Sequence, residues 1–457
     1  MIIHPLDNVE VREDGHKYAL RPIAAGENVI KYGMPIGHAT GDISPGDHVH
    51  SHNLATNLSG TLEYKWEGGA PEGCMAAGET RLSRPGEGFM GYRHADGRVG
   101  VRNDIWIVPT VGCVNDLCRR LAASCGGMAL THPYGCSQLG ADHEMTANLL
   151  AALCRHPNAG GVLVVALGCE NNTLDSFRKR IGDGANANIR FMRAQDPGDE
   201  FERGKELIAE LLAGRPAERV EIPVAELKVG LKCGGSDGFS GLTANPLVGR
   251  FSDWLVARGG STVLTEVPEM FGAETLLMRR CRNRAVFDKC VAMINGFKKY
   301  YAVHGQPCYE NPSPGNKAGG ITTLEEKSLG CVQKGGMSPV VDVLDYGEPV
   351  KEPGLSLMTG PGNDLVASTV LAAAGCHLVL FTTGRGTPFG TVVPTLKIAT
   401  NTTLAEAKPH WVDWDAMANP DVEAFAKKVL SVASGEHARN EDNSASEIAI
   451  FKDGVTL

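Results

Sequence analysis

The stretch Val162-Leu163-Val164-Val165-Ala166-Leu167 decides the fold class, because an unbroken apolar run of this length is typical of a strand that is buried on both faces. A second run of this kind spans residues 105–111, and helices are predicted near 114–125 and 141–155, between the two strands. Buried strands that alternate with helices favour a parallel sheet covered by helices on both sides. The sequence therefore predicts an α/β fold.

The pattern changes along the chain, which indicates several domains. Residues 1–65 contain short strand-like runs broken by Gly and Pro, typical of a small β module. Residues 66–88 are rich in Gly, Pro and Glu and predict a linker. Strands and helices then alternate through residues 89–225 and begin again in residues 226–457. We therefore expect a small β module followed by two α/β domains with mostly parallel sheets.

The composition excludes several classes of protein. The chain has 457 residues, a formal net charge of −9 and no Lys/Arg cluster, so neither a nucleic acid nor a membrane is an expected partner. No apolar run approaches the roughly 20 residues that span a bilayer. The first residues lack the pattern of a signal peptide. The 13 cysteines, an odd number, fit free thiols or metal ligands in a reducing cytoplasm.

Reactive side chains follow the predicted strands, usually beside glycine. Gly168-Cys169-Glu170 follows the strand quoted above, Cys233-Gly234-Gly235-Ser236-Asp237 follows strand 228–232, and Glu266 follows strand 262–265. Ligands of open α/β sheets bind beyond the carboxyl ends of the strands, so these side chains are expected to share a polar cleft. The same position is predicted for Cys113, His132, Cys136 and Arg385.

Three of these cysteines are candidate metal ligands. Taken singly, Cys136, Cys169 and Cys233 are explained equally well as small core residues. Taken together, three thiols at one cleft could ligate iron or an iron–sulfur cluster. The β module adds His48, His50 and His52. Alternation along one strand would put the three imidazoles on one face, where they could bind a metal; a solvated polar face is the alternative.

Two glycine-rich loops, residues 233–241 and 312–320, each precede a predicted helix. Backbone N–H groups at the start of a helix bind anions. Neither loop matches the Walker A or the GxGxxG pattern, so nucleotide binding is disfavoured and a carboxylate or a hydroxyl-rich substrate is favoured. The chain also contains no GxSxG or HExxH motif.

Long motifs then show a family resemblance. Residues 91–103, 156–162, 167–170, 232–246, 311–320, 334–336 and 381–402 resemble segments of the altronate/galactarate dehydratase family. Residues 46–54 resemble the SAF-type β-clip module of these enzymes, and the histidine-rich end of the module is most similar to the altronate branch. Residues 112–115 and 134–138 depart from the family pattern.

The resemblance implies dehydration of an aldonate or aldarate, such as D-altronate, to a 2-keto-3-deoxy acid, supported by Fe²⁺ or Mn²⁺. An iron–sulfur cluster is the less favoured cofactor. Galactarate dehydration, a sulfolactate sulfo-lyase-like β-elimination and a non-catalytic sugar-acid sensor are the alternatives. We expect a cytoplasmic homodimer.

Such a reaction needs groups that hold a carboxylate, a Lewis acid on the departing hydroxyl and a base. We hypothesise that the β module closes over the α/β cleft and that the roles fall on three sets of residues. The metal ligands would come from His48, His50, Cys136, Cys169, Cys233 and Glu266. The substrate-binding set is Arg385, Lys317, Gly234, Gly235, Ser236, Asn316 and Thr383. The candidates for proton transfer are Asp237, Glu170, Lys317 and His132.

Overall fold

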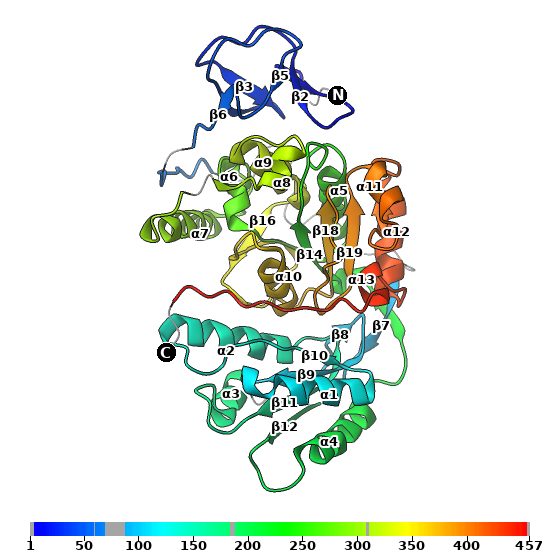
Figure 1. Cartoon of the computed structure of the whole chain (residues 1–457). Helices are drawn as coiled ribbons and strands as arrows, with labels where there is room; N and C mark the ends of the chain where they lie inside the picture. Colours follow the sequence, from blue (N-terminus) through cyan, green and yellow to red (C-terminus); the bar gives the residue numbers. More distant parts are fainter. Residues whose placement is uncertain (1–3, 59, 69–86, 183–187, 308–309, 455–457) are drawn as a thin grey trace.

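A computed structural model describes residues 4–58, 60–68, 87–182, 188–307 and 310–454, so most of the predicted linker lies outside the described residues. Figure 1 shows three parts stacked along the molecule: the N-terminal module at the top, the C-terminal α/β part in the middle and the other α/β part at the bottom. This arrangement confirms the predicted fold class, a small β module followed by two α/β parts.

The N-terminal module consists of two three-stranded antiparallel sheets. One sheet contains β1 (Val9–Val11), β2 (Lys17–Ala19) and β5 (His48–Val49). The other contains β3 (Asn28–Lys31), β4 (Met34–Ala39) and β6 (Leu54–Ala55). Alternate side chains of these short strands are buried in a common core, for example Val9, Val29, Ile36 and Val49.

The first α/β part is built on a four-stranded parallel sheet in the order β10-β9-β11-β12. All but the last residue of the stretch that predicted the fold lie in β11, a strand whose eight residues are all buried. Helices α1 and α4 cover one face of the sheet, and α2 and α3 cover the other. The elements are β9 (Asp104–Pro109), η1 (Gly112–Val114), α1 (Asn115–Cys125), β10 (Met128–Ala129), α2 (Gly140–Cys154), β11 (Ala159–Ala166), α3 (Leu174–Ile181), β12 (Ile189–Arg193) and α4 (Glu200–Gly214).

The second α/β part contains seven parallel strands in the order β16-β17-β15-β14-β18-β19-β20. Its strands are β14 (Lys228–Cys233), β15 (Ser261–Leu264), β16 (Val340–Leu344), β17 (Gly354–Met358), β18 (Leu378–Thr383), β19 (Thr395–Ala399) and β20 (Trp414–Asp415). The chain starts at β14, builds one side of the sheet as far as β17, and then returns to β18 to build the other side. The strand order therefore reverses between β14 and β18, where open α/β sheets bind ligands.

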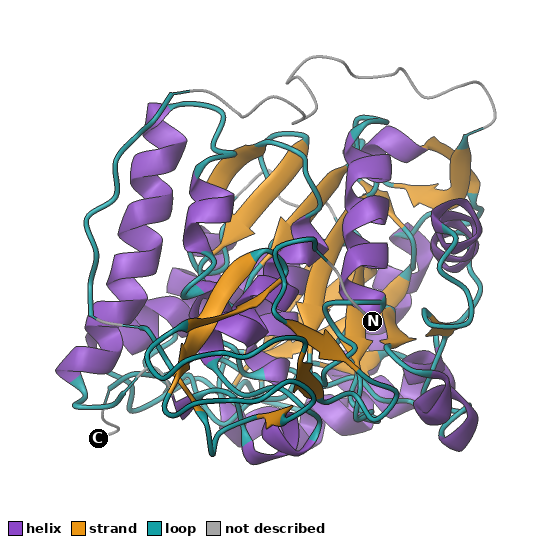
Figure 2. Ribbon diagram, turned by 90° about the horizontal axis from the view of Figure 1, so that it is seen from above, coloured by secondary structure: helices purple, strands orange, loops and turns teal. Residues whose placement is uncertain are grey.

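Helices flank this sheet on both faces (Figure 2). The helices α5, α7 and α12 share one hydrophobic core with the sheet and with η3, while α10 packs on the opposite face together with α2 of the first α/β part. The elements are η2 (Val224–Glu226), α5 (Ala244–Val256), η3 (Val267–Met270), α6 (Glu274–Met278), α7 (Arg284–Val303), α8 (Pro314–Ala318), α9 (Leu324–Cys331), η5 (Val332–Gly335), α10 (Asp364–Ala373), α11 (Thr402–Ala407), α12 (Val422–Ala433) and α13 (Arg439–Asp442).

A three-stranded antiparallel sheet, β13-β7-β8, joins the two α/β parts. It contains β7 (Gly88–Arg93), β8 (Val99–Gly100) and β13 (Val220–Pro223). Because one hydrophobic cluster also contains residues of both α/β parts, such as Leu149 and Leu371, the domain limits that we expect at residues 65, 88 and 225 stay a prediction. Among the described helices, none is long and apolar enough to cross a membrane.

Candidate active site

The reversal point of the seven-stranded sheet carries most of the predicted substrate-binding residues. The strand β14 ends at Cys233 and β18 ends at Thr383. The loops that follow are hydrogen bonded to each other, because the backbone N–H groups of Gly384 and Arg385 both donate to the carbonyl of Gly235, at 3.1 and 2.9 Å. The two loops therefore form one rim above the ends of β14 and β18.

This rim holds positive charge that the protein does not neutralise. The Arg385 side chain is exposed, and its guanidinium has no hydrogen bond or ion pair with the described residues. Among the residues that the structure describes, none accepts a hydrogen bond from the backbone N–H groups of Gly235 and Ser236. Thr383 is buried, and its hydroxyl accepts the N–H of Gly386, which fixes the turn that presents Arg385. Unpaired donors of this kind suit an anionic ligand.

Asp237 is the structural centre of the rim. Its carboxylate accepts hydrogen bonds from the Thr400 hydroxyl at 2.9 Å, the Asn401 amide at 3.0 Å and the Ser240 hydroxyl at 3.0 Å, and it has no cationic partner among the described residues. Burial raises its pKa. A Cβ atom at Gly384 would lie 2.1 Å from this carboxyl group, so only glycine allows the Arg385 loop to approach so closely.

The short helix α8 contributes Asn316 and Lys317. The Asn316 side chain is buried and donates to the carbonyl of Ser236 at 2.8 Å, which attaches α8 to the rim. Lys317 is half-buried, and its ammonium group has no partner among the described residues. Two residues later, Gly319 lies against Asp237, since a Cβ atom there would be 3.1 Å from the Cβ of Asp237. The loops that carry Lys317 and Arg385 thus meet at Asp237.

The N-terminal module contacts this same place through its backbone. A Cβ atom at Gly238 would lie 1.8 Å from the carbonyl oxygen of Gly15, and one at Gly320 would lie 2.2 Å from the same atom. Side chains are therefore excluded where the turn between β1 and β2 meets the 234–241 loop and the end of α8. This close approach explains the glycines of both sequence loops better than a nucleotide-binding role does.

Four imidazoles of the module gather beside this contact, and we call His16, His48, His50 and His52 the imidazole cluster. The Nδ1 atom of His16 lies 3.1 Å from the Nε2 atom of His48, and the ring of His48 stacks on those of His50 and His52. The Nε2 atom of His50 lies 2.9 Å from the carbonyl oxygen of Lys317, so this nitrogen carries the proton and donates. Burial and, for His48, the neighbouring histidines lower the pKa of His48 and His50.

The prediction that His48, His50 and His52 lie along one strand is wrong, although the three rings do lie together. The strand β5 ends at Val49, and residues 50–53 form a turn in which the Asn53 side chain accepts the N–H of His50 and donates to the carbonyl of His48. The turn, and not strand alternation, brings His50 and His52 to His48. His16 comes from the start of β2, which pairs with β5.

A buried ion pair fixes the module on α9. The ammonium groups of Lys17 and Lys31 lie 2.9 and 2.8 Å from the two carboxylate oxygens of Glu326, and all three side chains are at most 1% exposed. The two lysines lower the pKa of Glu326 to about 2, although burial alone would raise it. Burial lowers the pKa of Lys17 to about 8. The module thus already covers the rim in this structure.

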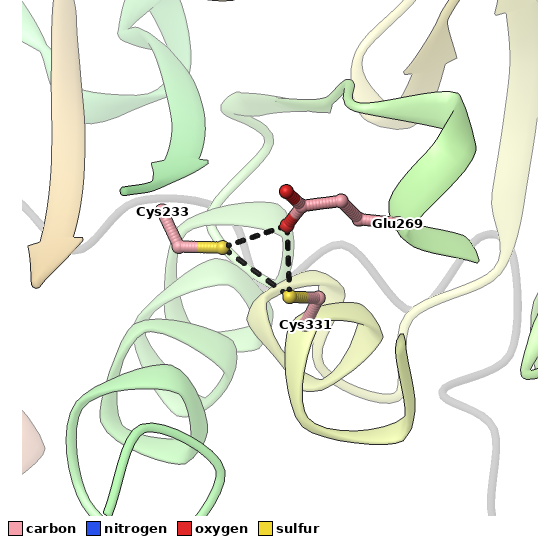
Figure 3. Close-up of side chains that lie close together, drawn as sticks. All are labelled: Cys233, Glu269 and Cys331. Carbon is pink, nitrogen blue, oxygen red and sulfur yellow. Dashed lines mark hydrogen bonds between the residues drawn. The ribbon is translucent and has the colours of Figure 1, made fainter. Parts of the chain in front are cut away.

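Below the rim lies a second group of reactive side chains. Cys233, Glu269 and Cys331 bring their side-chain donor atoms within 4.8 Å of one another, and all three residues are buried (Figure 3). Glu266, a predicted ligand, accepts the N–H of Cys233 at 3.1 Å and pairs with Lys232 and Lys334. We call Cys233, Glu266, Glu269 and Cys331 the thiol–carboxylate cluster.

The other predicted residues belong to the first α/β part. His132 is buried between the carbonyl of Pro109 and the N–H of Tyr134, and burial lowers its pKa to about 4. Glu170 accepts the Thr110 hydroxyl at 2.5 Å and the N–H groups of Leu167 and Gly168, which lowers its pKa despite burial. Both side chains stabilise loops with their polar atoms.

The structure also separates the predicted thiol ligands. Cys233 is the last residue of β14 in the seven-stranded sheet, whereas Cys136 follows β10 and Cys169 follows β11 of the four-stranded sheet. The sulfur atom of Cys136 lies 3.9 Å from the hydroxyl of Ser137, and the sulfur atom of Cys169 lies 3.8 Å from the side-chain amide of Gln195. Cys136 and Cys169 therefore do not join Cys233 in the thiol–carboxylate cluster.

Sequence reasoning missed His16, Glu269 and Cys331. His16 contacts His48, which the sequence did indicate. Glu269 and Cys331 lie beside Cys233, which was also among the predicted ligands. The position of Glu266-Val267-Pro268-Glu269 directly after β15 was the available signal for Glu269. A cavity of about 550 Å³ lies elsewhere and is lined by residues such as Tyr64, Trp66 and Arg279.

Fold and site together define a class: an α/β enzyme in which a small β module places imidazoles beside a rim of unpaired donor groups at the reversal point of the sheet. Comparison with known proteins gives the family. The model of the altronate/galactarate dehydratase SAF domain matches residues 4–57, that of the D-galactarate dehydratase/altronate hydrolase second domain matches 91–214, and that of the D-galactarate/altronate dehydratase C-terminal domain matches 224–456. The chain belongs to the D-galactarate/altronate dehydratase family.

Individual relatives agree with this assignment. The chain is 54% identical to an altronate dehydratase of Bacillus subtilis and 53% identical to one of Escherichia coli, in both cases over 98% of this chain and 94% of the relative. It is 33% identical to a galactarate dehydratase (L-threo-forming) of Escherichia coli, over 89% of this chain and 81% of the relative.

Proposed function

We propose that this protein is a hydro-lyase that removes water from a sugar acid, D-altronate or a close stereoisomer, and releases a 2-keto-3-deoxy acid. The similarity to two altronate dehydratases over nearly the whole chain supports this substrate. The observation that carries the proposal is that Arg385 and Lys317, two cations without a partner among the described residues, lie on loops that meet beside the imidazole cluster.

Each chemical requirement of the reaction has a candidate group. Negative charge builds on the substrate carboxylate as the proton beside it is removed, and Arg385 with the N–H groups of Gly235 and Ser236 would stabilise that charge. Lys317, on α8, would be a second cationic donor to the substrate. Asp237 itself acts as a positioning residue, because its hydrogen bonds to Thr400, Asn401 and Ser240 occupy the carboxylate and hold the rim in place.

His50 is the base that the geometry supports. Its Nε2–H donates to the carbonyl of Lys317, so the lone pair lies on Nδ1, whose recorded partner is the exposed hydroxyl of Ser51 at 3.0 Å. The lowered pKa keeps the ring neutral at physiological pH, as a base requires. Glu170 and His132 are less suited to this task, because their polar atoms are bonded within loops of the other sheet.

The family implies a divalent metal, Fe²⁺ or Mn²⁺, and the imidazole cluster fits one. The nitrogen atoms of His16 and His48 are 3.1 Å apart, and two ligands with bonds of about 2.1 Å to one ion lie about 3.0–3.4 Å apart. Neutral imidazole suits iron and related transition metals. We propose that His16 and His48 hold the ion, which would supply Lewis-acid assistance to the departing hydroxyl. An iron–sulfur cluster is less favoured here, because no thiol belongs to this group.

A substrate panel tests the function. Purified protein is incubated anaerobically with Fe²⁺ and individual hexonates and hexarates, and keto-acid product is measured. We expect the fastest turnover with altronate, and about a 10- to 100-fold rise in KM when Arg385 is changed to Ala, since a charge-assisted bond to a carboxylate contributes about 1.5–3 kcal/mol. Arg250→Ala, an exposed arginine of α5, is the matched control.

The outcomes separate the alternatives. Faster turnover of galactarate would move the substrate to the galactarate branch, and sulfite release from sulfolactate would identify a different leaving group. Binding of sugar acids without any product would reject the enzyme and favour a sensor. We also propose a cytoplasmic location, which is supported by the finding that every cysteine in the described residues is a free thiol. The homodimer stays a prediction.

A further inference from the structure

We propose that Cys233, Glu269 and Cys331 form a second metal site that takes a thiophilic divalent cation such as Fe²⁺ or Zn²⁺. This site is distinct from the imidazole cluster, and the inference goes beyond the proposed dehydratase function because it does not depend on any substrate. It rests on the geometry, the charge balance and the backbone conformation of the thiol–carboxylate cluster.

Three separate elements bring the donor atoms together, as Figure 3 shows. Cys233 ends β14, Glu269 lies in η3 and Cys331 ends α9. The sulfur atoms of Cys233 and Cys331 are 3.3 Å apart, and the Oε2 atom of Glu269 lies 3.4 Å from the first and 3.1 Å from the second. The three donors therefore form a nearly equilateral triangle around one point.

The size of this triangle is close to that of a metal site. Metal–sulfur bonds of about 2.3 Å and metal–oxygen bonds of about 2.1 Å in a tetrahedron place two sulfurs about 3.8 Å apart, and a sulfur and an oxygen about 3.6 Å apart. Each observed edge is only a few tenths of an ångström shorter. Small rotations of the side chains would open the triangle enough to admit an ion.

Glu266 lies beside this triangle, next to Cys233. Its Oε2 atom lies 3.7 Å from the sulfur of Cys233. Its backbone has a φ of 71°, a left-handed conformation that is unfavourable for residues other than glycine. This residue lies two positions after the end of β15 and turns the chain into η3, which carries Glu269. Strain of this kind is kept where it serves a function.

The charges of the surroundings balance for a divalent ion. Lys232, Lys327 and Lys334 pair with Glu266, Glu269 and Asp364, so three positive charges meet three negative ones. Binding of a divalent cation would remove one proton from each thiol, form two sulfur–metal bonds and move no electron, and the sum would remain zero. The ammonium group of Lys334, 2.8 Å from the sulfur of Cys233, is placed to stabilise a thiolate.

The donor set also predicts which metals bind. Thiolates favour Fe²⁺ and Zn²⁺ over the harder Mn²⁺ and Mg²⁺, whereas imidazoles accept several transition metals. Lys232, which pairs with Glu266 beside the cluster, also pairs with Asp364, whose side chain is 36% exposed.

Cobalt(II) provides a direct spectroscopic test, because only thiolate ligands give it a sulfur-to-metal charge-transfer absorption. Metal-free full-length protein is titrated with Co²⁺ under anaerobic conditions. We expect this absorption in the wild type, its loss in Cys331→Ser and in Cys233→Ser, and its retention in His48→Ala. Cys376→Ala, a buried thiol outside the cluster, and Cys136→Ser, a partly exposed one, are the matched controls and should keep the absorption.

A second measurement uses only the wild type, so that a variant that fails to fold cannot mislead: it follows the alkylation of individual cysteines with and without metal. Bound Zn²⁺ should protect Cys233 and Cys331, but not Cys113, from alkylation, as identified by peptide mapping. The proposal is overturned if the wild type shows no charge-transfer absorption, if both cluster variants retain it, or if Cys233 and Cys331 are found joined in a disulfide with no metal bound. Failure of the dehydratase assay with an intact cobalt signal would reject the proposed function alone.

Discussion

Replacement of Glu326 by Gln tests how the module is held over the site. Glu326 lies between Lys17 and Lys31, and all three side chains are excluded from water. The substitution keeps the shape of the side chain but removes the negative charge that compensates two buried ammonium groups. Removal of one partner from a buried ion pair leaves uncompensated charge, which is strongly destabilising.

The magnitude follows from the pKa of Glu326. The two lysines hold this pKa at about 2, against 4.5 for an unperturbed glutamate. A difference of about 2.5 units at about 1.4 kcal/mol per unit corresponds to about 3 kcal/mol in the free energy of unfolding. This value agrees with the about 3–5 kcal/mol that is typical when one partner of a buried pair is removed. Lys17 would lose its proton in the variant, because its pKa is about 8 even beside Glu326.

The pH dependence has a defined sign. The folded pKa of Glu326 is depressed, so its contribution to stability is present above pH 4.5 and is lost as the pH falls from 4.5 towards 2. Urea unfolding of wild type and Glu326→Gln at pH 7 and at several acidic values measures this directly. The difference of about 3 kcal/mol at pH 7 should shrink below pH 4.5.

An exposed ion pair of the same module is the matched control. Glu27→Gln removes the partner of Arg21, whose side chain is 53% exposed, and should change stability far less than Glu326→Gln does, because water screens an exposed pair. Because the module carries His16 and His48, Glu326→Gln should also lower kcat/KM at temperatures where the protein remains folded. Equal unfolding free energies for the two variants at pH 7 would refute the assigned role of the buried pair.

Three further predictions concern the site. His132→Ala should lower the free energy of unfolding, measured with urea, by about 2–4 kcal/mol, because packing is lost and the carbonyl of Pro109 is left unpaired. In a keto-acid assay the same variant should change kcat/KM by less than about threefold. A much larger kinetic loss would make His132 catalytic. Gly238→Ala should displace the module, because its Cβ would lie 1.8 Å from the carbonyl oxygen of Gly15, and should lower kcat/KM at least about 10-fold. Gly315→Ala meets no atom within 4 Å and is the matched control; equal activities would exclude a role for this backbone contact. Asn316→Ala should raise KM more than it lowers kcat, because α8 loses its bond to Ser236, and a change in kcat alone would contradict this.

Hydrophobic pattern was sufficient to predict the α/β fold. The apolar runs around Val162 and Leu380 became the fully buried strands β11 and β18, because burial on both faces leaves no place for polar side chains. The strand-end rule also worked within one sheet: Gly235, Asp237 and Arg385 were expected to share an edge, and the structure brings their loops into contact.

The same rule cannot tell which strands belong to one sheet. Cys136 and Cys169 follow strands as convincingly as Cys233 does, but they follow strands of the four-stranded sheet. Their separation depends on how the two α/β parts pack together, which the local pattern of apolar residues does not encode. The strand-end signal therefore identified reactive positions without assigning them to one site.

Partners that are far apart in sequence were the hardest to foresee. Lysine is rarely buried, so nothing marked Lys17 or Lys334 as a core residue before its partners were known. Glu326 and Lys17 are separated by about 300 residues in the chain, and only the docked module brings their charges together. His16 lies just before β2, far from His48 in the sequence. The antiparallel pairing of β2 with β5 brings the two side chains into contact.

The most direct test of the active site is metal reconstitution of a module variant. Metal-free wild type, His48→Ala and His38→Ala are titrated anaerobically with Fe²⁺ while dehydration of altronate is followed; His38 lies in the same module but outside the imidazole cluster. We predict that wild type and His38→Ala regain turnover and that His48→Ala does not. Equal recovery by all three proteins, or full turnover by the metal-free wild type, would contradict the proposed site.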